Sequence, residues 1–162
     1  MIINKEALDN ISAQAKASLR LRMNMDLRNS PDDGSQRMLN ALEHGTVMPI
    51  HRHRTSSETV VIIRGMIQWV FYDDDGNETE RVTLDANGEL RMLIVARGPW
   101  HSLVCLEEGS VLFEVKNGAY ALLGEVGAAF CNNGLHGGEP SKAIKVYNGV
   151  EEELKLDVQH QK

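Results

Sequence analysis

Short apolar segments separated by turn-forming residues follow one another closely between residues 37 and 115. The turn signals, among them the Asp- and Gly-rich stretches at 73–77 and 85–88, recur about every 8–12 residues, as in sandwiches and barrels of short antiparallel strands. No helical periodicity separates these segments, which argues against a parallel α/β architecture. The pattern therefore predicts an all-β fold with strands over residues 37–42, 47–53, 58–63, 66–72, 79–84, 90–96, 101–106 and 111–115.

The N-terminal region has a different periodicity. Apolar residues at spacings of three and four predict an amphipathic helix over residues 4–19, with Asn4 as its N-cap. From residue 19 to 27 apolar and polar residues alternate, which predicts a strand with one apolar and one polar face.

The C-terminal region is less regular, with a helix expected over 119–130 and strands over 144–147 and 154–158. A chain of 162 residues is long enough for one domain with a substantial core. We therefore expect a single domain made of an N-terminal helix and strand (1–30), a barrel core (31–118) and a C-terminal extension (119–162).

Composition limits the class of partner and the compartment. The net charge of −6 argues against nucleic acid or an anionic membrane surface as the main partner. No apolar run approaches the roughly 20 residues needed to span a bilayer, and no basic and apolar leader opens the chain, so we expect a cytoplasmic protein. Cys105 and Cys131 indicate no disulfide framework, and Cys105 is interpreted as a small apolar core residue.

Three histidines and one carboxylate carry the clearest chemical signal. His51 and His53 are one residue apart, so both side chains would leave a β-strand from the same face. Glu58 opens the next apolar segment, and His101 opens a later one. Three imidazoles and a carboxylate brought together by neighbouring strands suit one divalent transition metal such as Fe, Mn, Ni or Zn. Such a metal would retain open positions and act as a Lewis acid, a source of hydroxide or an oxygen activator.

The spacing of these residues resembles the first signature motif of the cupin superfamily. Gly45, His51, His53, Glu58 and Gly65 fill every fixed position of that motif. The resemblance implies a double-stranded β-helix, a jelly-roll barrel that often forms homodimers.

The second cupin motif is matched only in part. Gly98 and His101 fit it, whereas Ala96 replaces its proline, Cys105 replaces its final asparagine, and Leu90 replaces its opening glycine. None of the three departures falls on a metal ligand of the family, so the resemblance implies a metal held by His51, His53, Glu58 and His101.

Four further segments resemble the WbuC family of cupin-fold metalloproteins, and the similarity covers about residues 1–118. These segments are residues 36–42, 71–76, 100–101 and 111–116. Members of that family often come from gene regions for bacterial surface polysaccharide (O-antigen). The resemblance implies a metal and a role in polysaccharide biosynthesis, but it defines no reaction.

Candidate substrate residues lie near the predicted mouth of the barrel. Arg20, Arg22 and Asn24 form the polar face of the strand expected at 19–27, and such a face usually meets solvent. The alternative is that Arg20 and Arg22 join Arg37 in an anion subsite, because arginine pairs bidentately with phosphate or carboxylate. Candidate neighbours of the metal that would make the pocket apolar are Trp100, Met48, Ile63 and Trp69, and Trp100 is also a candidate substrate residue.

Three classes of function remain open at this point. The first is an enzyme, a metal-dependent isomerase, lyase or oxygenase acting on a small carbohydrate-derived or carboxylated substrate. The second is a non-catalytic sugar- or metal-binding module, and the third is a structural or partner-binding barrel in a polysaccharide assembly system. No residue in the sequence identifies a separate general base.

Overall fold

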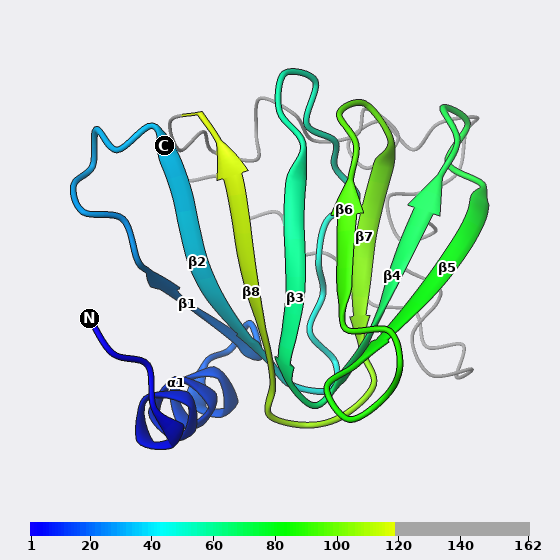
Figure 1. Cartoon of the computed structure of the whole chain (residues 1–162). Helices are drawn as coiled ribbons and strands as arrows, with labels where there is room; N and C mark the ends of the chain where they lie inside the picture. The colour runs from blue at the N-terminus through cyan, green and yellow to red at the C-terminus, as the bar shows by residue number, and fades with distance from the viewer. Residues whose placement is uncertain (119–162) are drawn as a thin grey trace, which may run out of the picture.

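The computed structural model describes residues 1–118, which form one helix followed by eight strands (Figure 1). The elements expected at 119–130, 144–147 and 154–158 lie outside the described residues. No helix in the described part of the chain is long and apolar enough to cross a lipid bilayer. The elements are α1 (Lys5–Ala17), β1 (Arg22–Asp26), β2 (Ser35–Leu42), β3 (Glu58–Arg64), β4 (Met66–Tyr72), β5 (Glu78–Asp85), β6 (Met92–Val95), β7 (Trp100–Cys105) and β8 (Ser110–Asn117).

The strands form two antiparallel sheets that pack face to face (Figure 1). The larger sheet has the strand order β1-β2-β8-β3-β6, and the smaller sheet has the order β5-β4-β7. Apolar side chains from both sheets meet between them, among them Val60 of β3, Trp69 of β4 and Leu103 of β7. This architecture confirms the all-β jelly-roll barrel with a short N-terminal helix.

Helix α1 covers the outer face of the larger sheet near β1 and β2. Ile11 and Ala15 are buried there against Leu39, Ala41 and Val111. The side chain of Asn4 accepts a hydrogen bond from the backbone N–H of Ala7 (3.0 Å), which confirms the predicted N-cap.

The strand predicted from residue 19 begins later, at Arg22. The chain turns at 18–21 after the helix ends, so Leu19 is fully exposed rather than part of an apolar strand face. Leu21 has a φ of 53°, in the left-handed region that a non-glycine residue rarely adopts. Leu19 fits both the helical period before it and the alternating period after it. The pattern therefore could not locate where the helix ends and where β1 begins.

The strand predicted over 47–53 is also wrong. This segment is extended but irregular, and it contacts β7 through a single bridge between His51 and His101. Pro49 explains the difference, because proline has no backbone N–H to donate to a ladder.

Gly65 forms the tight connection between β3 and β4. Its φ is 76°, and a Cβ at this position would lie 2.9 Å from the Cα of Ser110. Glycine is therefore required at position 65, the last position of the cupin-like motif over residues 45–65.

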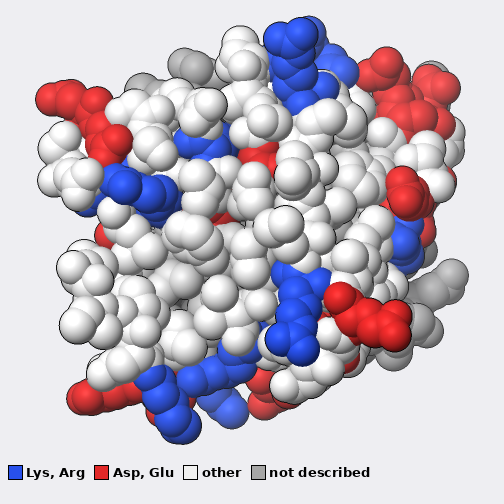
Figure 2. All heavy atoms as spheres, viewed as in Figure 1, with Lys and Arg blue, Asp and Glu red and all other residues white. Residues whose placement is uncertain are grey.

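The charged side chains on the face seen in Figure 2 are scattered around its rim, and the middle is largely uncharged. The described lysines and arginines form no continuous basic patch on this face (Figure 2).

Candidate metal centre

Three imidazoles meet between the two sheets. One ring nitrogen from each of His51, His53 and His101 lies within 4.8 Å of the others. His51 and His53 come from the irregular segment between β2 and β3, and His101 comes from β7. The structure therefore brings His101 to the neighbouring pair His51 and His53, from which it is widely separated in the sequence.

Backbone hydrogen bonds fix the relative positions of these histidines. The N–H of His51 donates to the carbonyl oxygen of His101 (2.9 Å), and the N–H of His101 donates to the carbonyl oxygen of His51 (2.8 Å). The carbonyl oxygen of His53 accepts a bond from the N–H of Gly98 (2.8 Å). The irregular segment is thus joined to β7 directly at the ligand positions.

Two prolines set the tautomers of two of the histidines. Nδ1 of His51 lies 2.9 Å from the carbonyl oxygen of Pro49, and Nδ1 of His101 lies 3.0 Å from that of Pro99. Since a carbonyl oxygen can only accept, each Nδ1 must carry a proton, and Nε2 is the ring atom left to bind a metal. Carbonyl partners of this kind commonly orient metal-binding histidines.

His51 is held in its neutral form. Burial, together with the nearby His101, lowers the pKa of His51 to about 3. A neutral imidazole is the form that ligates a metal.

Glu58, the first residue of β3, is buried against the same cluster. Its Oε1 lies 2.8 Å from Nε2 of His101, and its Oε2 lies 3.5 Å from Nε2 of His53. Burial on its own would raise the pKa of Glu58, but the contacts with His101 and His53 outweigh this effect and hold the pKa well below its usual range. The carboxyl group is therefore ionised.

The contact between Glu58 and His101 fits a bound cation. Both atoms are buried, and neither has a hydrogen-bond partner among the described residues. With one proton of His101 on Nδ1, the 2.8 Å contact between Nε2 and the ionised Oε1 is favourable only if a second ring proton or a metal ion supplies positive charge there. A metal ion fits the spacing, because neighbouring ligands bound to one ion at about 2.1 Å stand roughly 3 Å apart.

The predicted apolar neighbours are divided between the two sides of the sheets. Trp69 stacks on His101, with ring centroids 5.3 Å apart, and Met48 lines the adjacent pocket. Ile63 does not contribute, because Ile62 points into the core and Ile63 points outward with 42% of its surface exposed. Trp100 occupies the outer side of β7, where its indole N–H donates to Asp74 (3.0 Å).

A pocket leads from His51 and His53 to the surface between β1, β2 and β8. Arg20, Arg22 and Asn24 line it, so three of the predicted substrate residues lie beside the histidine cluster. The other described residues that line it are Gln36, Met38, Asn40, Met48, Glu114 and Lys116.

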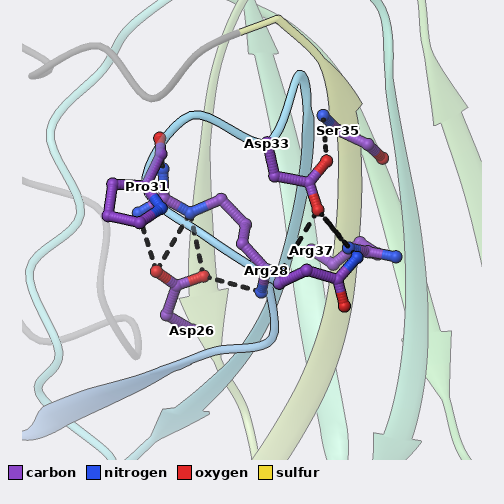
Figure 3. A network of polar contacts seen from close by, with 7 residues as sticks. Asp26, Arg28, Pro31, Asp33, Ser35 and Arg37 are labelled. Atoms are coloured by element: carbon purple, nitrogen blue, oxygen red, sulfur yellow. Dashed lines mark hydrogen bonds and ion pairs between the residues drawn. The ribbon is translucent and has the colours of Figure 1, made fainter.

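Arg37 lies outside this pocket. Its neighbours Gln36 and Met38 point into the pocket, and the alternation of β2 sends Arg37 to the opposite face. There it pairs with Asp33 in the loop between β1 and β2, next to the ion pair of Asp26 and Arg28 (Figure 3). Arg37 therefore stabilises the loop, and no contact places it with Arg20 and Arg22.

Sequence reasoning missed Glu114 and Lys116, two charged residues of β8 that line the pocket. Nζ of Lys116 lies 3.5 Å from Nε2 of His53 and 4.0 Å from Oε1 of Glu114. Glu114 accepts a hydrogen bond from Asn40 (3.1 Å), while burial and the charge of Glu58 raise its pKa to about 7. The available signal was the pair of charges two residues apart in an otherwise apolar strand.

The remaining sulfur and imidazole groups lie elsewhere. Cys105 is buried in the core between the sheets, as interpreted from the sequence, and burial raises the pKa of its thiol. His44 is outside the cluster and lies 2.8 Å from the carbonyl oxygen of Leu106. Cys131 lies outside the described residues.

Comparison with protein families gives one match. The model of a family described as a domain of unknown function (DUF6016) matches residues 3–84. No curated protein sequence matches the chain.

Comparison with solved structures identifies cupin-fold neighbours. CapF bound to 3-isopropenyl-tropolone has a TM-score of 0.51 and 19% identity, and the match covers 60% of this chain and 28% of that one. Oxalate oxidase bound to glycolate has a TM-score of 0.50 and 14% identity, with coverages of 64% and 54%. Oxalate decarboxylase of Bacillus subtilis has a TM-score of 0.50 and 19% identity, with coverages of 67% and 28%. The chain thus spans about half or less of these proteins, and the likeness concerns the fold.

Proposed function

Because this chain belongs to the family described as a domain of unknown function (DUF6016) and has a cupin fold, we propose that it binds one divalent transition metal inside the barrel. The ligands are His51, His53, His101 and Glu58. The single observation that carries the proposal is the 2.8 Å contact between Glu58 and His101, two buried groups whose facing atoms have no hydrogen-bond partner among the described residues.

The chemistry of the donor set supports a metal that takes both nitrogen and oxygen ligands. Imidazoles suit Zn, Fe and Ni, and a carboxylate also suits Mn. When bound, such an ion supplies Lewis acidity at the coordination positions that the protein leaves open. The pocket lined by His51 and His53 gives a small molecule access to those positions.

The charges of the pocket support an anionic ligand. Arg20, Arg22 and Lys116 line it together with one carboxyl group, that of Glu114. With a divalent ion beside Glu58, the pocket is cationic in a chain whose net charge is −6. A small carboxylated or carbohydrate-derived molecule suits this arrangement, because arginine and a metal both bind carboxylates.

Metal content of the purified protein tests the proposal. Protein prepared without added metal is expected to hold about one equivalent of a transition metal by elemental analysis, and His51→Ala and His101→Ala to lose most of it. His44→Ala, which removes an imidazole outside the cluster, is the control and should keep the metal. Full occupancy in both ligand variants would reject the site.

Charge reversal tests the anionic ligand separately. Arg20→Glu is expected to weaken binding of carboxylated sugars or nucleotide-sugars at least tenfold while the metal content stays unchanged, because a favourable charge contact becomes repulsive. Titration calorimetry with such a panel provides the measurement. Equal affinities in the variant and the wild type would remove Arg20 from the ligand site.

Two functions follow from a metal in this pocket. The first is catalysis as an isomerase, lyase or oxygenase, and Glu114 and Lys116 lie close enough to the cluster to contact a bound substrate. The second is non-catalytic binding of a sugar or of the metal itself. Turnover of the same panel, with and without oxygen, distinguishes them.

Three narrower expectations stay predictions from the sequence. They are membership of the WbuC family, a role in surface-polysaccharide biosynthesis, and a homodimer. The mass of the native protein in solution, compared with the 18.0 kDa of one chain, decides the last of these.

A further inference from the structure

We propose that Arg52, Asp74 and Trp100 form a clamp on the outside of the barrel that positions the metal-ligand histidines. Cζ of Arg52 lies 4.1 Å from the centroid of the Trp100 ring. Oδ1 of Asp74 accepts two hydrogen bonds, one from Nη1 of Arg52 (3.1 Å) and one from the indole N–H of Trp100 (3.0 Å). The inference rests on the proposed metal site and concerns how that site is held.

The place of the clamp in the sequence connects it with the ligands. Arg52 lies between His51 and His53, and Trp100 directly precedes His101. In extended backbone successive side chains point to opposite sides. The histidines therefore point inward to the cluster, while Arg52 and Trp100 meet on the outer side.

The ligand-bearing segment needs such a contact because it is not part of a sheet. It is joined to β7 by the two hydrogen bonds between His51 and His101 and by the bond from Oγ of Ser102 to the carbonyl oxygen of Met48 (2.7 Å), and Gly98 adds a bond to His53. The next regular element, β3, begins only at Glu58. The clamp adds a side-chain tether at the same point of the chain.

The third member of the clamp is presented by a rigid turn. Asp74 lies in the turn between β4 and β5, and its neighbour Asp73 accepts hydrogen bonds from the backbone N–H groups of Asp75 (2.9 Å) and Asn77 (2.8 Å). Asp74 is therefore held in place although 84% of its side chain is exposed. Through this turn the smaller sheet helps to hold the ligand-bearing segment.

Stacking on the indole ring is the main contact of the clamp. An exposed ion pair alone contributes little to stability. The Arg52 side chain, however, is only 19% exposed, and its Nε has no hydrogen-bond partner among the described residues. A planar guanidinium fits such a site, where the ring and one carboxylate are its partners.

Removal of Arg52 should change the metal affinity in one direction if Arg52 acts only through its charge, and in the other if it positions the ligands. Loss of a nearby cation reduces repulsion, so electrostatics alone would tighten binding of a divalent metal. Loss of a residue that orients ligands weakens metal binding, commonly by 10–100-fold. The direction of the change therefore identifies the role.

The experiment measures Co²⁺ affinity and the Co²⁺ visible absorption spectrum in four variants. Arg52→Ala and Asp74→Ala break the clamp. Arg54→Ala and Asp75→Ala remove the same charges from the same segments and are the matched controls. We expect roughly tenfold weaker Co²⁺ binding and an altered spectrum in the two clamp variants relative to their controls.

Hydrogen exchange of the metal-free protein supplies a readout that needs no metal. Amides of residues 49–54 should exchange faster in Arg52→Ala and Asp74→Ala than in the controls, with the unfolding temperature of Asp74→Ala unchanged. Unchanged exchange would overturn the clamp, including in the case where the wild type binds no Co²⁺ and the metal site itself fails. Faster exchange with unchanged Co²⁺ affinity would overturn the positioning role.

Discussion

At the residue scale, His51 and His101 share the same local arrangement. Each follows a proline by two residues, and each has its Nδ1 next to the carbonyl oxygen of that proline. The two Pro-x-His segments then pair through reciprocal backbone hydrogen bonds. The protein thereby presents two Nε2 atoms side by side before any ion arrives, which reduces the cost of ordering the ligands.

The stacking of Trp69 on His101 makes metal binding visible by fluorescence. Because the two ring centroids are 5.3 Å apart, an open-shell ion bound to His101 should quench the emission of Trp69 by electron or energy transfer. Titration with Co²⁺ is expected to quench the wild type strongly, and Zn²⁺, with its closed shell, to quench much less. Trp69→Phe retains only Trp100 and should lose most of the effect; equal quenching in this variant would place the metal elsewhere.

Some of the site could be predicted from individual residues, and some depended on strand register. The spacing of His51, His53 and His101 was sufficient to predict that they meet. Glu114 and Lys116 were missed because charges on alternate positions of a strand usually indicate a solvent-exposed face. In this strand that face lines a pocket, and only the pairing of β8 with β2 and β3 reveals it.

At the scale of elements, most strands were predicted correctly from the sequence. The start of β1 and the segment over 47–53 were predicted incorrectly. Period-two patterns bounded by strong turns located β4 and β5 well, because the turn at 73–77 fixes where β4 ends and where β5 begins. The segment over 47–53 was also predicted to be a strand, yet Pro49 prevents a continuous ladder. Its position depends on the bridge to His101, a contact between residues too far apart in sequence for a local pattern to predict.

Helix α1 contributes to stability but lies on the outer side of the larger sheet, away from the proposed metal ligands. Ile11 is 1% exposed and packs in the cluster beneath the helix. Ile11→Ala should lower the free energy of unfolding by about 3 kcal/mol, measured by urea denaturation, and leave the metal content unchanged. The fully exposed Leu19 provides the control, since Leu19→Ala should change stability by less than about 0.5 kcal/mol. Loss of metal in folded Ile11→Ala would contradict this separation.

At the scale of the whole molecule, the proposed ligands come from both sheets and from the segment that connects β2 with β3. Glu58 belongs to the larger sheet and His101 to the smaller one. A bound ion would therefore cross-link the two layers of the barrel. It would stabilise the native state alone, because the unfolded chain does not assemble the site.

Metal removal should accordingly destabilise the entire fold. A ligand at 100 times its dissociation constant adds about 2.7 kcal/mol, which corresponds to a rise of roughly 5–10 °C in Tm for a chain of this size. Scanning calorimetry before and after chelation, and again after metal is restored, measures the change. His53→Ala should have the Tm of the chelated wild type before chelation, after chelation and after metal is restored. A wild-type Tm that does not change on chelation would indicate that no ion joins the layers.

The reciprocal hydrogen bonds between His51 and His101 also bear on when the proposed metal site is complete. During synthesis the first two histidines and Glu58 leave the ribosome well before β7, so the nascent chain exposes only a partial set of donors. The set is complete once β7 has docked against the earlier segment. If the proposed site binds an ion, its capture would then be a late event in biogenesis, and the ion acquired would reflect the metal pool that surrounds the finished barrel.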